Sequence, residues 1–110
     1  MTYDDVLADR VRTLLAGVDD VSERAMFGGL GFMVRGNMAL AASSTADLMV
    51  RVHPDDGEAW IDGEAVRPME MQGRVTRGWL LVDTAALVED EHLQEWVDRG
   101  VARALSLPAK

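Results

Sequence analysis

Hydrophobic residues near the start of the chain repeat with the spacing of one helical face. Their separations of four, seven, eight and eleven residues are typical of an amphipathic helix that packs one side on a core. We therefore predict a helix over residues 3–16, with Thr2 as its N-cap and Gly17 just beyond its end. The repeat is formed by Leu7, Val11, Leu14, Leu15 and Val18.

After residue 22 the pattern changes to the alternation of strands with one buried face. It predicts strands over 23–27, 30–35, 38–42 and 48–53, with a two-residue hairpin turn at Gly36-Asn37. We expect the core-facing side of the second of these to carry Leu30, Phe32 and Val34.

A glycine-rich stretch joins the first two of these strands. Its motif consists of Met26, Phe27, Gly28, Gly29 and Gly31. Glycine permits bends, bulges and positive φ, so we predict a structural bend here. A dinucleotide fingerprint would need a helix after the glycines, but the residues after Gly31 continue as a strand, and a P-loop lysine is absent.

The rest of the chain completes an α+β pattern. Pro54 is expected to begin a short helix through Trp60, and 66–71 and 75–82 to form a strand pair, with Pro68 indicating an edge strand. The closing helix is expected to have Asp90 as its N-cap, with Gly100 allowing close packing on the sheet. Its apolar stripe is Leu93, Trp96, Val97, Gly100, Val101, Ala104 and Leu105. We predict one domain over residues 1–110: a mostly antiparallel five-stranded sheet with the N- and C-terminal helices on one face.

Composition restricts the class of partner. The 110 residues carry a net charge of −8, and the excess acid lies in the two terminal segments, 1–23 and 83–110. A field of this sign disfavours direct binding to nucleic acids and to anionic membranes. Cysteine is absent, which favours a reducing cytoplasm, and no apolar run approaches the roughly 20 residues that span a bilayer.

Candidate chemistry is sparse. His53 lies beside Asp55 and Asp56, as in some metal sites, but acids after a proline are ordinary first-turn helix residues. His92 is expected to be solvated, and no serine lies in a nucleophile elbow. We therefore predict no catalytic residue, no metal and no cofactor.

The sheet side away from the helices is a candidate interaction face. Methionine and arginine alternate with core residues on several predicted strands, a composition common at protein interfaces. In the plainer interpretation the arginine stems merely cover the sheet. The face would consist of Met33, Arg35, Met49, Arg51, Arg77 and Trp79.

The stretch from Arg24 to Met38, with its Met-Phe-Gly-Gly, resembles the N-terminal domain of the TfoX/Sxy family. The later segments 67–71, 73–74 and 77–79 resemble small stand-alone bacterial members, which lack the family's second domain. The resemblance implies an α+β fold similar to secretion chaperones and no known catalysis. Named members regulate competence as coactivators beside a DNA-bound transcription factor.

Together these observations predict a non-catalytic regulatory or protein-interaction domain of the cytoplasm. Its partner would be either another protein or, in a homodimer, a second copy of the chain, and the sequence does not decide between the two. One alternative is a small-molecule or nucleotide binder with a pocket near the Gly28–Gly31 bend and Trp79. Another is a DNA-associated coactivator that uses the six arginines between residues 24 and 82.

Overall fold

The computed structural model describes residues 5–26, 29–43, 47–71 and 73–108, with the side chains of all of these except 26, 71 and 75–77. The helices are α1 (Asp5–Leu14), α2 (Pro54–Trp60), the short 3₁₀ helix η1 (Thr84–Leu87) and α3 (Asp90–Ser106). The strands are β1 (Val21–Met26), β2 (Gly29–Val34), β3 (Asn37–Ala42), β4 (Asp47–Arg51), β5 (Val66–Met71) and β6 (Arg74–Asp83). Thr2 lies outside the described residues.

The six strands form one sheet in the order β1-β2-β3-β4-β6-β5, and every pair is antiparallel. The α+β class is therefore confirmed, but the expected count of five strands is wrong. β1 and β2 are antiparallel partners with Met26 opposite Gly29, so the two predicted strands are joined by a reversal of the chain and not by a bend. Phe27 and Gly28 lie outside the described residues.

The β2–β3 turn is one residue earlier than predicted. Val34 pairs with Asn37, so the two turn residues are Arg35 and Gly36, with φ of 54° and 84°. Positive φ at both positions matches the twist that a two-residue hairpin needs. The Arg35 N–H donates to the carbonyl of Asp20 at 3.0 Å, which fastens the turn to the loop before β1.

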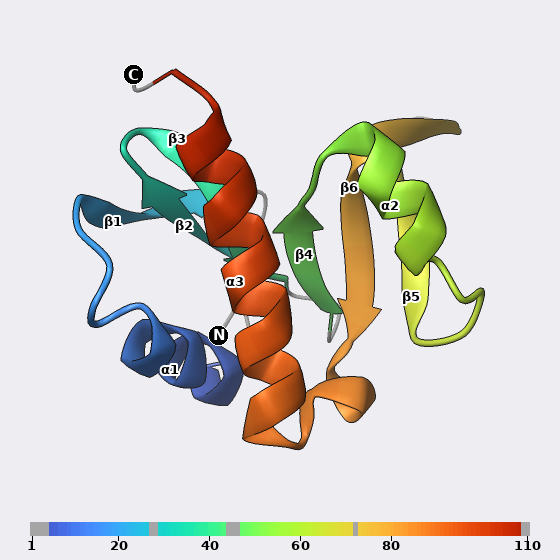
Figure 1. Ribbon diagram of the computed structural model, residues 1–110. Coiled ribbons are helices and arrows are strands. Elements are labelled where there is room, and N and C mark those ends of the chain that lie inside the picture. Colours follow the sequence, from blue (N-terminus) through green and yellow to red (C-terminus); the bar gives the residue numbers. More distant parts are fainter. Residues whose placement is uncertain (1–4, 27–28, 44–46, 72, 109–110) are drawn as a thin grey trace.

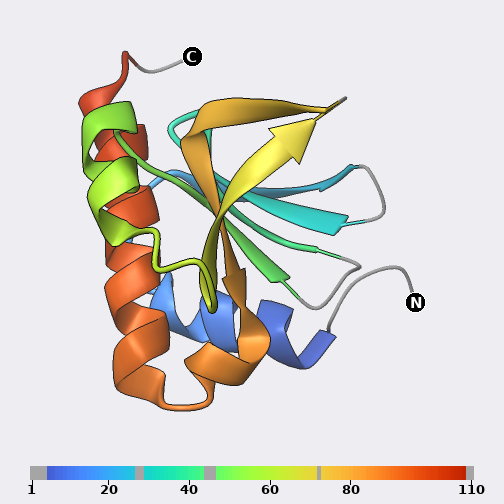
Figure 2. The same ribbon diagram turned by 90° about the vertical axis from the view of Figure 1, so that its right-hand side faces the viewer.

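The three α-helices cover one side of the sheet (Figures 1 and 2). In Figure 1, α3 crosses in front of the strands between α1 and α2. The core lies between these layers, and its fully buried side chains include Phe32, Leu40, Val50, Leu93 and Val97. Edge strand β5 contains Pro68 and a register shift, devices that discourage pairing with another sheet.

The closing helix confirms the predicted close approach at Gly100. A Cβ built on Gly100 would lie 2.7 Å from the Ala39 carbonyl oxygen, so α3 rests directly on β3. Two details of the prediction are wrong. Glu89, whose backbone is extended, is the N-cap in place of Asp90, and Leu105 is 46% exposed because it falls on the flank of the buried stripe.

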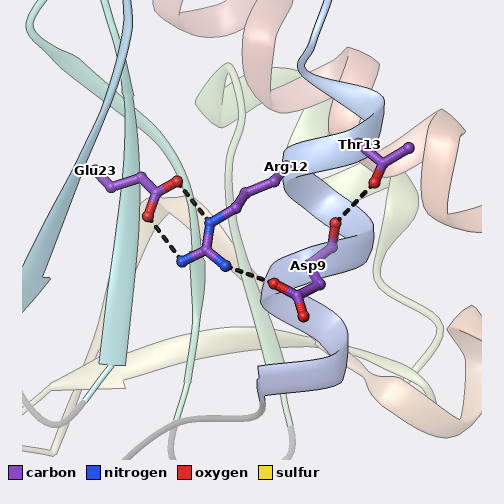
Figure 3. Close-up of polar contacts among 4 residues, drawn as sticks. All are labelled: Asp9, Arg12, Thr13 and Glu23. Atoms are coloured by element: carbon purple, nitrogen blue, oxygen red, sulfur yellow. Dashed lines mark hydrogen bonds and ion pairs between the residues drawn. The ribbon is translucent and has the colours of Figure 1, made fainter.

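A charged network joins α1 to β1 (Figure 3). The Arg12 guanidinium donates to both carboxylate oxygens of Glu23, at 2.7 and 2.9 Å, and to Asp9 at 2.6 Å. The hydrogen bond from Arg12 lowers the pKa of Glu23 below its ordinary value, against a smaller opposing effect of burial. The bidentate geometry orients α1 on the sheet edge.

We expect Glu23→Gln to reduce the free energy of unfolding by about 0.5 kcal/mol near neutral pH, since both partners are well exposed to solvent. Because the pKa of Glu23 is lower in the folded than in the unfolded state, its ionised carboxylate stabilises the fold at any pH above the unfolded-state pKa. This stabilisation is lost as the pH falls through the pKa of the folded state. Denaturant titrations should therefore separate the variant from wild type at pH 7 and not at pH 3. Glu64→Gln, an exposed control, should not differ from wild type at either pH, and a Glu23→Gln difference that persists at pH 3 would contradict the electrostatic cause.

Candidate functional site

The sheet side opposite the helices, called the outer face below, carries half-buried apolar and cationic side chains. Met33 lies between the fully buried Phe32 and Val34, so it points away from the core. Met49 lies between the fully buried Leu48 and Val50 and is placed in the same way. These predicted side chains therefore do lie on the outer face.

The centre of the outer face brings two of the predicted residues together. Arg51 in β4 is directly opposite Trp79 in β6, and its guanidinium carbon is 5.7 Å from the centre of the indole ring. Beside them, Met49 is opposite Leu81, which is also half-buried. The result is a contiguous patch of methionine, leucine and tryptophan with an arginine stacked on it, and Leu81 is a member that sequence analysis missed.

Two predicted members of the face need correction or stay open. Arg35 belongs to the β2–β3 turn, at positive φ, so it does not continue the alternation of β2. It is exposed at the end of the hairpin instead of lying over the sheet. Arg77 lies in β6, but its side chain is outside the described part of the chain.

A partly buried ion pair borders the patch. Arg67 of β5 reaches across β6 to Asp47 of β4, with 2.6 Å between Nη2 and Oδ1. Asp47 is 8% exposed and lies directly opposite Asp83 in the sheet. Arg67 therefore neutralises a carboxylate that would otherwise lie beside a second one.

On the helix side, a cavity of about 280 Å³ lies between α2, α3 and the end of β4. Its polar lining comes from His53, Asp56, Arg99, Arg103 and Ser106. Apolar walls are supplied by Val52, Trp60 and Ala102. We call it the α2–α3 cavity.

One wall of the α2–α3 cavity is held by two tryptophan rings packed against each other. Trp60 and Trp96 meet edge to face with 6.0 Å between ring centres. The Arg99 guanidinium lies 4.2 Å from the Trp60 centre and 4.5 Å from the Trp96 centre, and it also pairs with Glu95. Arg99 is thus already engaged on three sides.

The site residues predicted from the sequence did not include Arg99 or Arg103. Their i, i+4 spacing places both on one side of α3, which is a signal for a shared surface. Nothing in the sequence placed α2, some 40 residues earlier, against that surface. The cavity therefore depends on tertiary packing.

The histidine beside the acids is a helix cap. His53 Nδ1 accepts from the Asp55 backbone N–H at 3.2 Å, so a neutral ring carries its proton on Nε2. Nδ1 also lies 3.8 Å from Asp55 Oδ2. This contact is an ion pair only when the His53 ring is protonated. In the described ranges, no three His, Asp or Glu side chains are grouped to hold a metal ion.

Ser106 is occupied in a similar way. Its hydroxyl donates to the Arg103 carbonyl at 2.6 Å and accepts from Arg103 Nη1 at 3.3 Å. Neither histidine side chain is hydrogen-bonded to a hydroxyl in the part of the chain that the structure describes. The α2–α3 cavity is therefore suited to binding and presents no activated nucleophile.

The predicted pocket near the glycine bend stays a prediction, because Phe27 and Gly28 lie outside the described residues. Gly29 is packed against β3, since a Cβ there would be 2.7 Å from the Ala42 carbonyl oxygen. The α2–α3 cavity and two shallower hollows among the described residues are lined by other side chains than Gly29, Gly31 and Trp79. The glycine motif has a structural role, because it lets two strands approach closely.

The arrangement of helices over an antiparallel sheet occurs in a solved protein. The crystal structure of Deinococcus radiodurans protein DR2400, which carries the domain DUF419, has a similar fold with a TM-score of 0.65. The match covers 94% of this chain and 90% of that one at 19% identity, so it shows a shared fold alone. No curated protein matches the chain significantly.

The sequence also matches the TfoX N-terminal domain over residues 13–104. The chain therefore belongs to the TfoX N-terminal domain family, as the Met-Phe-Gly-Gly stretch indicated. Within the described residues, no helix is both long and apolar enough to cross a membrane.

Proposed function

We propose that this chain is a non-catalytic interaction domain of the cytoplasm that binds another protein through its outer face. The observation that carries the proposal is the patch at Met49, Leu81, Arg51 and Trp79, half-exposed on the sheet side that no described helix covers. Family membership supports a regulatory role, and the absence of cysteine favours a reducing compartment.

The chemistry of the patch favours one kind of partner surface. Methionine adapts to irregular apolar surfaces, and arginine stacked on tryptophan is a frequent anchor at interfaces. The chain carries a net charge of −8, and Arg51 gives this patch a positive charge. We expect a partner surface with apolar side chains surrounded by carboxylates.

The proposal is tested by two matched apolar-to-lysine substitutions. Met49→Lys places a charge at the centre of the outer face, where an interface would have to desolvate it. Val6→Lys places the same charge on α1, where Val6 is 71% exposed. The tagged chain should capture its partner from native cytoplasm as wild type and as Val6→Lys, and at least about tenfold less as Met49→Lys.

Melting temperatures of both variants act as the control for folding. Equal capture by Met49→Lys and wild type would refute the outer face as the binding surface. Capture of no specific protein by the wild-type chain would refute the proposed function itself.

A further inference from the structure

The α2–α3 cavity contains an arginine that the protein itself does not neutralise. Arg103 Nε is buried and has no hydrogen-bond partner in the described chain. Its Nη1 contacts the Ser106 hydroxyl at 3.3 Å, and Arg103 forms no ion pair with a carboxylate among the described residues. A guanidinium presents five donors, so most of those on Arg103 are left for something else.

Further positive charge lies close by. Arg99 brings a second guanidinium to the cavity lining, where it is paired with Glu95. The neutral ring of His53 adds an Nε2–H donor, because its Nδ1 is used to cap α2. In a chain of net charge −8, this gathering of donors is a local site of the opposite character.

We infer that the α2–α3 cavity binds a small organic monocarboxylate, with Arg103 as the residue that pairs with its carboxylate. Val52, Ala102 and the Trp60 ring form an apolar wall for the rest of the ligand. The volume of about 280 Å³ is near the lower end for small-molecule sites, roughly 300–1,000 Å³. This site is separate from the outer face and does not depend on the proposed function.

The charges in the lining favour one negative charge over two. Arg99 is already paired with Glu95, which leaves Arg103 as the unpaired cation among the described lining residues. Asp56 also lines the cavity and would repel a second negative charge. A carboxylate can form a bidentate pair with the one planar guanidinium of Arg103. That single positive charge would not balance the two negative charges of a phosphate dianion.

The test uses 3-phenylpropionate as the probe, with uncharged 3-phenylpropionamide and inorganic phosphate as comparators. Binding is followed by backbone NMR titration, which also locates the site. We expect saturable shifts at His53, Ala102 and Ser106 with 3-phenylpropionate, and at least about tenfold weaker binding of the amide and of phosphate.

Variants separate the site from general effects. Arg103→Gln should weaken 3-phenylpropionate binding at least about tenfold. Arg74→Gln removes an exposed arginine from the β5–β6 hairpin and should leave the dissociation constant unchanged. Arg103→Lys keeps the charge without the planar fork, and we expect partial recovery.

Three results would overturn the inference: no saturable shift at millimolar probe, shifts that map elsewhere, or affinity that Arg103→Gln does not change. Phosphate binding as tightly as the carboxylate would overturn the assigned ligand class. If Arg103→Gln fails to fold, the wild-type chain still tests the inference. The NMR shifts then show where 3-phenylpropionate binds, and the comparison with 3-phenylpropionamide shows whether the carboxylate is required.

Discussion

Gly100→Ala is expected to destabilise the protein by about 2 kcal/mol, although alanine is the better helix former. The added Cβ would lie 2.7 Å from the Ala39 carbonyl oxygen and 2.8 Å from Leu40 Cδ2. The first of these is backbone and cannot rotate away, so α3 must lift from β3 or the strand must shift. Thermal melting should show a fall of roughly 10 °C for a domain of this size.

Gly17→Ala is the matched control. A Cβ at Gly17 meets nothing within 4 Å, and its φ is not positive. We expect that variant to be as stable as wild type, or up to about 1 kcal/mol more stable because the unfolded chain loses freedom. Equal melting temperatures for Gly100→Ala and Gly17→Ala would show that α3 does not rest on β3 as described.

The second large effect is expected at the Arg67–Asp47 ion pair that borders the patch on the outer face. Arg67→Met keeps the length of the stem and removes the charge, which leaves the buried Asp47 carboxylate opposite Asp83. Removing one partner of a buried pair is costly because the other stays desolvated. The Arg67 side chain is 43% exposed, so we expect about 2 kcal/mol by denaturant unfolding at pH 7 and not the full cost of a deeply buried pair.

A double variant separates this cause from a simple loss of packing. Adding Asp47→Asn to Arg67→Met removes the remaining carboxylate charge and should restore at least half of the lost stability. Arg74→Met, on an exposed arginine of the same hairpin, should cost less than about 0.5 kcal/mol. A double variant less stable than Arg67→Met alone would contradict the electrostatic explanation.

The fold could be predicted well wherever one residue's environment follows from its neighbours in sequence. The apolar repeat located α1, and alternation located β2, β3 and β4 within a few residues. The turn at Arg35-Gly36 was misplaced because Gly36-Asn37 has the more usual turn composition, whereas the pairing of Val34 with Asn37 decides the register. Six strand ranges were predicted, but the total was given as five, and the join at the glycines was interpreted as a bend because glycine permits a bend and a reversal equally.

The same limit applies to the candidate sites: features that follow from neighbouring residues could be predicted, and contacts between distant segments could not. Alternation placed Met33, Met49 and Trp79 away from the core, but it could not show that Arg51 stacks on Trp79, since pairing of β4 with β6 joins segments far apart in the chain. The α2–α3 cavity could not be predicted at all. It requires α2 and α3 to lie side by side, and their contact is set by the packing of Trp60 against Trp96 and Arg99.

The outer face as a protein-binding surface is tested most directly by photo-crosslinking in cells that naturally produce the chain. p-Benzoylphenylalanine replaces Trp79 with a side chain of similar size, and the same group at Val6, 71% exposed on α1, is the control. We predict a discrete adduct from position 79, none from position 6, and loss of the adduct when Met49→Lys is added. An adduct of twice 12.0 kDa would identify a second copy as the partner, and any other mass a different protein. No adduct from position 79, or equal adducts from both positions, would contradict the account.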